Sequence, residues 1–274
     1  MLNASYLPKI LFITPDLIFF HNNKAADDKL REIGRGKKAY FFKNLLNELY
    51  QIGFDVHMAQ PEYRKMFSFF STRGDQSDCS DIPRNRLHLV RDRIFYYSDD
   101  IDVNRDGENI KISIALQREI IHQLIPMIQP DLIHCHDWMT GLIPAAARGM
   151  GIPCLFTVYD TRSKQTPLSC IEDMGIDAAC FWENLFYHRM PLCYEETRKS
   201  NPVDLLLSGI LAADFVNAAS LGFASEVLIC QAGDNKTTLR QLLRTKCQRG
   251  CVSCKYKGTP DTREYIDIYN ALLN

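Results

Sequence analysis

The sequence lacks long apolar segments and a strong net charge, and each absence excludes a class of protein. No run approaches the roughly 20 apolar residues that a membrane-spanning helix needs. The first apolar run, Ile10–Ile13, is cut by Thr14-Pro15-Asp16, so no secretory signal peptide is recognisable. The formal net charge is −1, which gives no general attraction to nucleic acid or to an anionic membrane. We therefore expect a cytoplasmic protein with neither kind of partner.

The chain also has no internal repeat and no low-complexity tract, and its composition is that of a globular domain. It has 274 residues, of which 46% are hydrophobic and 24% are charged. These values are ordinary for a globular protein with a well-formed core. The length allows one large domain or two small ones.

Cysteine, by contrast, is abundant, with ten residues. They do not form the short, dense framework of a small secreted protein, so we expect reduced thiols of a cytosolic protein. Cys247, Cys251 and Cys254 are spaced closely enough to share a metal ion, but three thiolates are one ligand short of a closed tetrahedral zinc site. We expect uncoordinated thiols here, with a bound metal as the alternative, and we predict no metal site and no cofactor.

Apolar strand-like runs alternate with helical patterns along the whole chain, which predicts one doubly wound parallel α/β sheet of the Rossmann-like kind. Strands are expected at 9–14, 54–59, 87–90, 93–97, 154–158 and 214–220, and at 132 onward. Helices are expected at 39–51, 110–128, 141–149, 181–187, 203–213 and 222–228.

The most informative stretch runs from Pro130 to Pro144. A buried strand is followed by His134, His136, Asp137 and Trp138, and then by the start of a helix. Ligands in open α/β sheets bind outside the carboxyl ends of the strands, so these residues are a site candidate. Because side chains alternate along a strand, the two histidines share one side. They are either metal ligands of a hydrolase or hydrogen-bonded structural groups.

A glycine-containing basic turn, Gly34-Arg35-Gly36-Lys37-Lys38, precedes the first expected helix. Backbone N–H groups and cations at a helix N-terminus suit a phosphate group. The pattern matches neither of the established glycine-rich phosphate loops, so a solvated basic turn is the alternative. A second turn, Asp102 to Gly107, opens like a calcium loop but has Ser113 where the bidentate glutamate belongs, and we expect an acidic surface turn.

Several motifs together resemble the N-terminal domain of bacterial glycogen synthases and plant starch synthases, which are retaining glucosyltransferases. The strongest is Pro-Asp-Leu-Ile-His-Cys-His-Asp-Trp-Met-Thr-Gly-Leu at 130–142, close to the family's Pro-Asp-x-x-His-x-His-Asp-Trp-x-x-Gly-Leu. The other matching segments follow in the family's order at 9–16, 44–49, 53–56, 156–158 and 206–214, with Ser220.

The resemblance implies one half of a GT-B architecture, in which two Rossmann-like domains face each other across a cleft. Residues 1–274 are then a single first domain, with the second, nucleotide-sugar domain absent and a separately encoded second domain as a candidate partner. The implied acceptor is an α-glucan or maltooligosaccharide. The implied substrate-binding residues are His136, Asp137, Trp138, Thr140 and Gly141. Catalytic positions fall on Asp137 and on Tyr159, where the family has a histidine.

The departures from the family concern the donor side. The family's loop Lys-x-Gly-Gly-Leu-x-Asp aligns with residues 34–40, so that Gly34 replaces the lysine, Lys37 the second glycine and Tyr40 the acidic residue. Tyr159 cannot act as the family histidine does. These changes argue against ADP-glucose binding by this chain alone. The chain is therefore expected to be an inactive or divergent transferase domain, with a non-catalytic relative that binds glucan or protein as the alternative.

Overall fold

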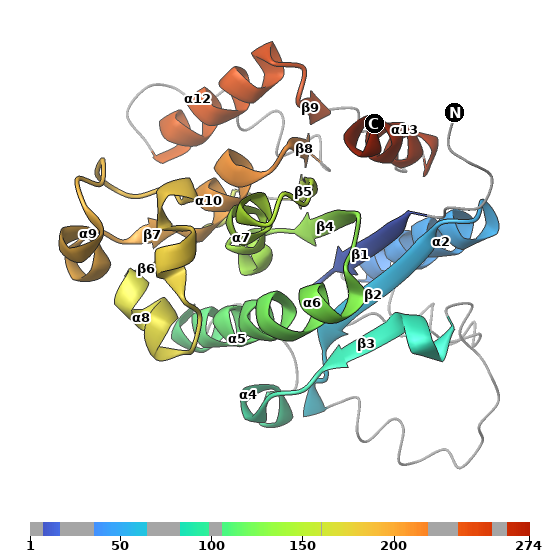
Figure 1. The fold of residues 1–274 in the computed structure, drawn as a ribbon, viewed down its shortest axis with the longest axis horizontal. Helices are drawn as coiled ribbons and strands as arrows, with labels where there is room; N and C mark the ends of the chain where they lie inside the picture. Colours follow the sequence, from blue (N-terminus) through green and yellow to red (C-terminus); the bar gives the residue numbers. More distant parts are fainter. Residues whose placement is uncertain are drawn as a thin grey trace.

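The fold is a twisted seven-stranded sheet with helices on both faces, as a computed structural model shows (Figure 1). The structure describes residues 8–16, 36–64, 83–98, 106–159, 161–218, 235–253 and 262–274. All neighbouring strands of the sheet run parallel, in the order β3-β2-β1-β4-β5-β8-β9. The predicted doubly wound α/β class is therefore confirmed.

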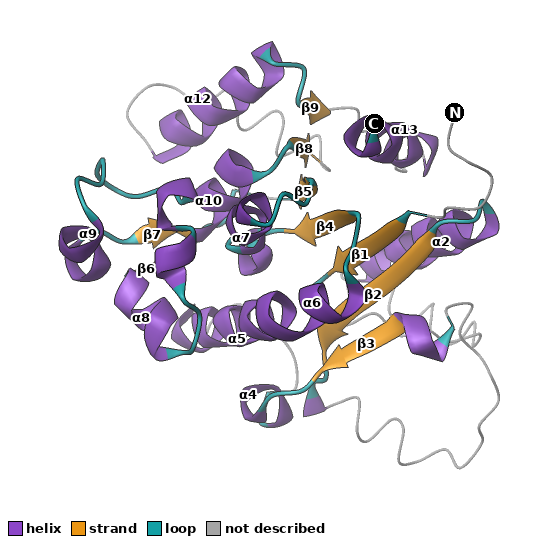
Figure 2. Ribbon diagram, viewed as in Figure 1, coloured by secondary structure: helices purple, strands orange, loops and turns teal. Residues whose placement is uncertain are grey.

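The strands of the main sheet are short, and their bounds are β1 Lys9–Ile13, β2 Asp55–Pro61, β3 Leu87–Val90, β4 Leu132–His136, β5 Cys154–Val158, β8 Phe215–Ala218 and β9 Val252–Ser253. Two further strands pair with each other in antiparallel fashion, β6 Gln165–Thr166 and β7 Val203–Asp204. Figure 2 shows the strands in orange, with the main sheet crossing the middle of the molecule.

The helices connect these strands, and their bounds are α2 Gly36–Gln51, α4 Arg93–Tyr96, α5 Asp106–Glu119, α6 Ile125–Ile128, α7 Ile143–Gly149, α8 Leu168–Asp173, α9 Tyr194–Ser200, α10 Leu205–Ala212, α12 Asn235–Gln248 and α13 Thr262–Leu273. Short 3₁₀ turns lie at Arg84–Arg86, Trp138–Thr140, Ala178–Cys180 and Trp182–Asn184. No helix within these described segments is both long enough and apolar enough to cross a bilayer.

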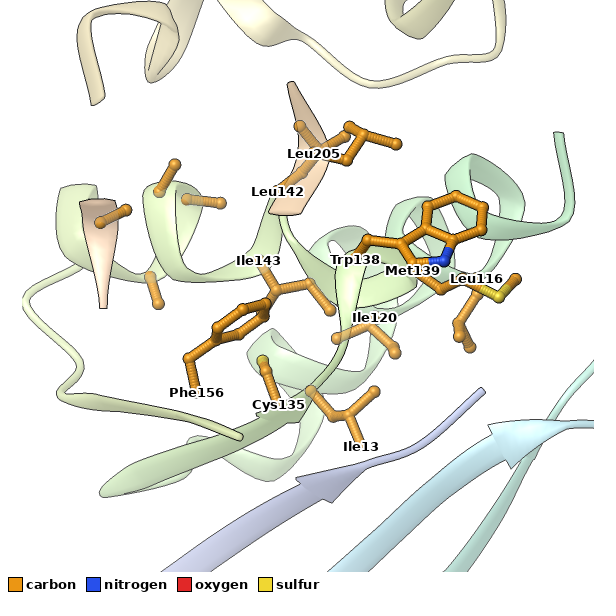
Figure 3. Packing of buried hydrophobic residues seen from close by; sticks show 14 of the residues in the cluster. Ile13, Leu116, Ile120, Cys135, Trp138, Met139, Leu142, Ile143, Phe156 and Leu205 are labelled. Atoms are coloured by element: carbon orange, nitrogen blue, oxygen red, sulfur yellow. The ribbon is translucent and has the colours of Figure 1, made fainter. Parts of the chain in front are cut away.

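Alternation along the strands divides the core into two clusters. Ile10 and Phe12 of β1 pack with α2 and α13 on one face, whereas Leu11 and Ile13 pack with α5, α7 and α10 on the other. Both faces are covered, which explains why the strands read as continuous apolar runs rather than as alternating ones. The larger cluster lies under α5, α7 and α10, and Figure 3 shows part of it around Cys135 and Phe156.

Two predictions about local structure were wrong, and one predicted helix begins two residues later than expected. The segment 93–97 is not a strand, because Asp92 caps a one-turn helix there and its carboxylate accepts from the backbone N–H of Ile94. The segment 181–187 is not one helix but a 3₁₀ turn followed by the bridge between Tyr187 and Val203. The helix expected from 203 begins at Leu205, after the two residues of β7. The helix expected at 222–228 lies outside the described residues.

The long helix expected at 110–128 is present but contains a π-helical segment, Ile120–Leu124, between α5 and α6. Pro126 lies two residues after its end, in α6. A proline has no N–H and its ring clashes with the carbonyl four residues earlier, so the backbone widens locally to accommodate it.

Candidate functional site

The candidate site lies at the switch point of the sheet. From β1 the chain moves outward to β2 and β3, then returns to β4 on the other side of β1 and continues to β5 and β8. The connections therefore leave the carboxyl ends of β1 and β4 in opposite directions, and ligands of open α/β sheets bind at such a switch point. Thr14–Asp16 follow β1 and Asp137 follows β4 at this edge.

His136 is the last residue of β4, and protein groups hold it on several sides. Its side chain is 1% exposed, and its Nδ1 donates to the carbonyl of Ile13 at 2.8 Å. Its ring lies 4.7 Å from that of Phe42 and 6.1 Å, nearly parallel, from that of Tyr159. His136 therefore links the ends of β1, β4 and β5 with helix α2.

Asp137 has an unusual backbone conformation, with φ 58° and ψ 177°. This region is essentially restricted to glycine, and an L-residue held there costs about 1–3 kcal/mol. Two hydrogen bonds hold the residue in place: its N–H donates to the carbonyl of Thr157 at 2.9 Å, and its Oδ1 accepts from the N–H of Tyr159 at 2.9 Å. The carboxylate therefore stands at the switch point, joined to the end of β5.

Thr140 fixes the turn that follows. Its hydroxyl accepts from the N–H of His136 at 2.9 Å and lies 3.0 Å and 3.1 Å from the carbonyls of His136 and Asp137. Its side chain is fully buried. Thr140 is thus a turn-forming residue that sets the position of the two residues before it.

Trp138 and Gly141 both pack inside the protein. Trp138 is 9% exposed and belongs to the larger hydrophobic cluster, and Figure 3 shows its ring near Met139 and Leu116. Gly141 lies against α10, because a Cβ there would come within 1.8 Å of the carbonyl oxygen of Leu205. Trp138 therefore fills the core, and Gly141 permits a close approach of two backbones.

Helix α5 holds the same turn from below. The amide oxygen of Gln117 accepts from the N–H of Leu142 at 2.6 Å, and its Nε2 donates to Ser113 at 3.0 Å. The hydroxyl of Ser113 donates in turn to the carbonyl of Met139 at 3.0 Å. Both side chains are fully buried. Helical spacing placed these two polar residues only within a helix, and no feature of the sequence indicated this support.

Tyr159 is the residue that the resemblance predicts at the position of the family histidine. Burial, followed by the nearby Tyr265 and the carboxylate of Asp137, raises the pKa of its phenol well above the usual value. The group is therefore neutral at physiological pH and is no general base. Its ring lies edge-on to Phe42 at 6.1 Å between centroids.

His134 lies on the same side of β4 as His136, as predicted, with 4.2 Å between ring centroids. Both nitrogens of its fully buried ring have protein partners: Nδ1 lies 2.7 Å from the hydroxyl of Tyr269 and Nε2 lies 2.8 Å from that of Thr157. Burial, and next His136, lowers the pKa of His134 well below its usual value. His134 is neutral and structural, and binding a metal would require breaking these bonds.

Helix α13 supplies groups that sequence reasoning missed. Tyr269 bonds His134, and the hydroxyl of Tyr265 accepts from the side chain of Asn217 at 2.6 Å. The spacing of Tyr265, Ile268 and Tyr269 on one helical face was the available signal.

Within the described residues, no three His, Cys, Asp or Glu side chains gather in a way that would hold a metal ion. Cys247 lies in α12 and Cys251 directly before β9, while Cys254 lies outside the described residues. The calcium-like turn is only partly described: Asp106 and Gly107 open α5.

The basic turn is also only partly described. Gly36, Lys37 and Lys38 form the first turn of α2, so this helix starts three residues earlier than predicted. Gly34 and Arg35 lie outside the described residues. The contact between Phe42 and His136 brings the beginning of α2 to the switch point.

Comparison with known proteins identifies a family to which the chain is similar. The starch synthase catalytic domain family matches residues 36–244. A glycogen synthase from Geotalea daltonii is 23% identical over 247 residues, which cover 82% of this chain and 48% of the relative. A glycogen synthase from Xanthomonas campestris is 29% identical over 149 residues, covering 52% of this chain and 28% of the relative. The chain thus spans at most about half the length of these relatives.

A solved structure agrees with the fold. The catalytic domain of starch synthase IV from Arabidopsis thaliana, bound to ADP and acarbose, superposes with a TM-score of 0.61 at 15% identity. The match covers 90% of this chain and 51% of that one. Since the family match spans most of the chain, the protein belongs to the starch synthase catalytic domain family, and its fold is that of a glycogen or starch synthase-like glycosyltransferase domain.

Proposed function

We propose that this domain is the acceptor side of a glucan synthase: it binds an α-glucan or maltooligosaccharide at the β1–β4 switch point. Asp137 contacts the sugar, and glucosyl transfer from ADP-glucose requires a second, nucleotide-sugar-binding domain. Transfer needs a positioned acceptor hydroxyl and a stabilised donor phosphate, and this chain supplies groups for the first requirement.

The observation that supports this proposal most directly is the backbone of Asp137. A glycine at this position would relieve the strain of φ 58° and ψ 177°, yet a carboxylate stands there. Strained residues cluster at sites where their side chain has a task. The Oδ1 of Asp137 accepts a hydrogen bond from the N–H of Tyr159. This bond fixes the direction of the carboxylate at the edge where ligands of such sheets bind.

The residues that align with the family's donor-binding loop support the need for a second domain. Lysine and glycine of the family loop are replaced at Gly34 and Lys37, and the phenol of Tyr159 stands in place of an imidazole. Relatives of the chain are glycogen synthases about twice its length. The described Arabidopsis protein holds ADP, whereas the residues of this chain that align with the donor loop have lost its charge pattern.

The test is calorimetric titration of the purified chain with maltohexaose and, separately, with ADP-glucose, beside a glucosyltransferase assay. We expect glucan binding without turnover. Asp137→Ala should weaken glucan binding at least tenfold, since a hydrogen bond from a charged group is worth about 1.5–3 kcal/mol. Asp131→Ala is the matched control, because Asp131 lies at the opposite end of the same strand and bonds the N–H of Lys9.

A third variant separates function from folding. Asp137→Gly removes the same carboxylate but relieves the backbone strain. Its free energy of unfolding should therefore be about 1–3 kcal/mol higher than that of Asp137→Ala, while the two variants bind glucan equally poorly. Absence of glucan binding by the wild type would contradict the acceptor role. Turnover by the isolated chain would contradict the need for a second domain.

A further inference from the structure

Helix α13 carries two buried phenol groups into an interface that is otherwise mainly apolar. It packs on the face of the sheet that α2 also covers, and Tyr265 and Tyr269 are both buried there. A buried hydroxyl group needs a hydrogen-bond partner, because leaving it unpaired costs free energy. The phenols of α13 therefore bond polar groups on the strands beneath the helix.

These bonds tie three neighbouring strands to α13. The hydroxyl of Tyr269 lies 2.7 Å from Nδ1 of His134 on β4. The hydroxyl of Tyr265 accepts from the side chain of Asn217 on β8 at 2.6 Å and is hydrogen-bonded to the side chain of Thr157 on β5. The hydroxyl of Thr157 also lies 2.8 Å from Nε2 of His134. Thr157 is therefore the residue at which the bonds from α13 meet.

The backbone of Thr157 holds the strained residue of the candidate site. Its carbonyl accepts from the N–H of Asp137 at 2.9 Å. Two residues further along the chain, the N–H of Tyr159 donates to the carboxylate of Asp137 at 2.9 Å. A residue in a sparsely populated backbone conformation keeps it only where the surrounding structure over-determines it. The end of β5 supplies this constraint, and the side chain of Thr157 anchors the end of β5.

Thr157 also lies beside the histidine at the end of β4. In the parallel pairing of β4 with β5, Thr157 is the partner of His136. The ring of His136 lies 4.2 Å from that of His134 and 6.1 Å, nearly parallel, from that of Tyr159. A shift of β5 would therefore move this ring and the carboxylate of Asp137 together.

We propose that Thr157 and Tyr265 are positioning residues for Asp137: the bond from α13 to the Thr157 hydroxyl holds the end of β5, which holds the carboxylate in the direction that a sugar meets. Both side chains are buried, Thr157 fully and Tyr265 with 2% exposed, so they act through Asp137 rather than on the ligand. The positioning of Asp137 rests on these contacts, whereas its effect on glucan affinity rests on the proposed function.

The first measurement is calorimetric titration of the whole chain with maltohexaose. Thr157→Val keeps the shape of the side chain and the backbone carbonyl but removes the hydroxyl. It should weaken binding about five- to tenfold, because the carboxylate loses its fixed direction. Thr157→Ser keeps a hydroxyl and should bind within about threefold of the wild type. Tyr265→Phe removes the phenol hydroxyl on the other side of the bond and should weaken binding about as much as Thr157→Val.

A matched control separates positioning from general stability. Ile268 packs on the same face of α13 as Tyr265, within the same hydrophobic cluster. Ile268→Val removes one methylene group from this cluster and no hydroxyl, so it lowers stability without breaking the bond to Thr157. Its affinity for maltohexaose should equal that of the wild type.

The second measurement observes the amide proton of Tyr159 by NMR, because this proton is donated to the carboxylate of Asp137. Asp137→Ala gives the position of the resonance without its carboxylate partner. In Thr157→Val and in Tyr265→Phe the resonance should move upfield, toward that reference position. In Ile268→Val it should stay where it is in the wild type.

The outcomes separate this proposal from the proposed function. An unmoved Tyr159 resonance and wild-type affinity in Thr157→Val and Tyr265→Phe overturn the positioning role and leave glucan binding at the β4 tip standing. A loss of affinity in Ile268→Val as large as in Thr157→Val shows a general effect of core packing and overturns the positioning role as well. A shifted Tyr159 resonance in a chain that binds no maltohexaose supports the positioning of Asp137 and contradicts the proposed function alone.

Discussion

Two pairs of histidines lie in this sheet, and their surroundings differ in one decisive respect. His134 and His136 share a face of the central strand β4, where hydroxyls and a carbonyl surround their rings. His57 and His88 lie on the outer strands β2 and β3, stacked at 5.2 Å with 9° between ring planes. Here the partners are charged: Nη1 of Arg86 lies 2.9 Å from Nε2 of His57, and Asp55 holds Arg86 at 2.9 Å.

The difference teaches what fixes the protonation state of each pair. An arginine only donates, so Nε2 of His57 must accept, and the proton of this ring lies on Nδ1, which points to Nε2 of His88 at 2.9 Å. Burial, and next the positive charge of Arg86, keeps the outer pair neutral. The central ring of His134 is neutral chiefly because burial excludes its charged form.

The largest expected effect concerns the central pair. His134→Ala should lower the free energy of unfolding by about 3–5 kcal/mol, because it opens a cavity and leaves the buried hydroxyls of Tyr269 and Thr157 without their ring partner. His88→Ala, on the half-buried outer strand, should cost only about 1 kcal/mol. Urea denaturation of both variants measures the contrast, and equal losses would show that strand position does not matter.

A smaller effect isolates one bond of the central network. Tyr269→Phe keeps the ring in the core but removes the hydroxyl that meets His134 at 2.7 Å. We expect a loss of about 1–2 kcal/mol in the free energy of unfolding, measured by the same denaturation. If the losses of unfolding free energy in His134→Ala and Tyr269→Phe simply add in the double variant, the two residues are not coupled in the way that the structure indicates.

The smallest expected change in stability at neutral pH concerns the outer histidine pair. At acidic pH this pair has a distinct effect. Burial, followed by the charge of Arg86, lowers the pKa of His57 to about 4 and also lowers that of His88. The unfolded chain takes up protons near pH 6.5 that the folded pair does not bind, so the stability from this pair is complete above pH 6.5 and falls as the pH drops toward 4.

The variant His57→Gln/His88→Gln should therefore lose less stability than the wild type between pH 7.5 and pH 5. Urea denaturation at several pH values within this range gives the two slopes. The remaining slope of the variant should reflect His134, whose pKa is lowered as well. Identical slopes for the two proteins would mean that the outer histidines titrate alike in the folded and unfolded states.

Much of this fold could be predicted from the sequence, because strands that are buried on both faces appear as continuous apolar runs. Apolar runs gave β1, β2, β4 and β5 within one or two residues. The same reasoning failed at 93–97, where Arg-Ile-Phe-Tyr-Tyr reads as a strand. A single cap by Asp92 decided that segment, and periodicity over five residues carries no information about such a bond.

The site was predicted less completely, for a physical reason. The motif identified His136 and Asp137 as neighbours at a strand tip, and the structure places them there. It did not reveal that Thr140 and Gly141 form the turn, or that Gln117 supports it from α5, because these roles depend on hydrogen bonds and close approaches between distant segments. The role of Asp137 toward a sugar stays a prediction, and the strain at its backbone was not visible in the sequence.

The bond between His134 and Tyr269 also has a consequence for how the chain folds. The two residues are 135 positions apart, and α13 covers the same face of the sheet as α2. A ribosome delivers β1, α2 and β4 long before α13, so the part of this face that α13 covers stays exposed while the rest of the domain is synthesised. Contacts at such separation slow folding and leave apolar surface open to aggregation, so the central strand is completed only when α13 docks.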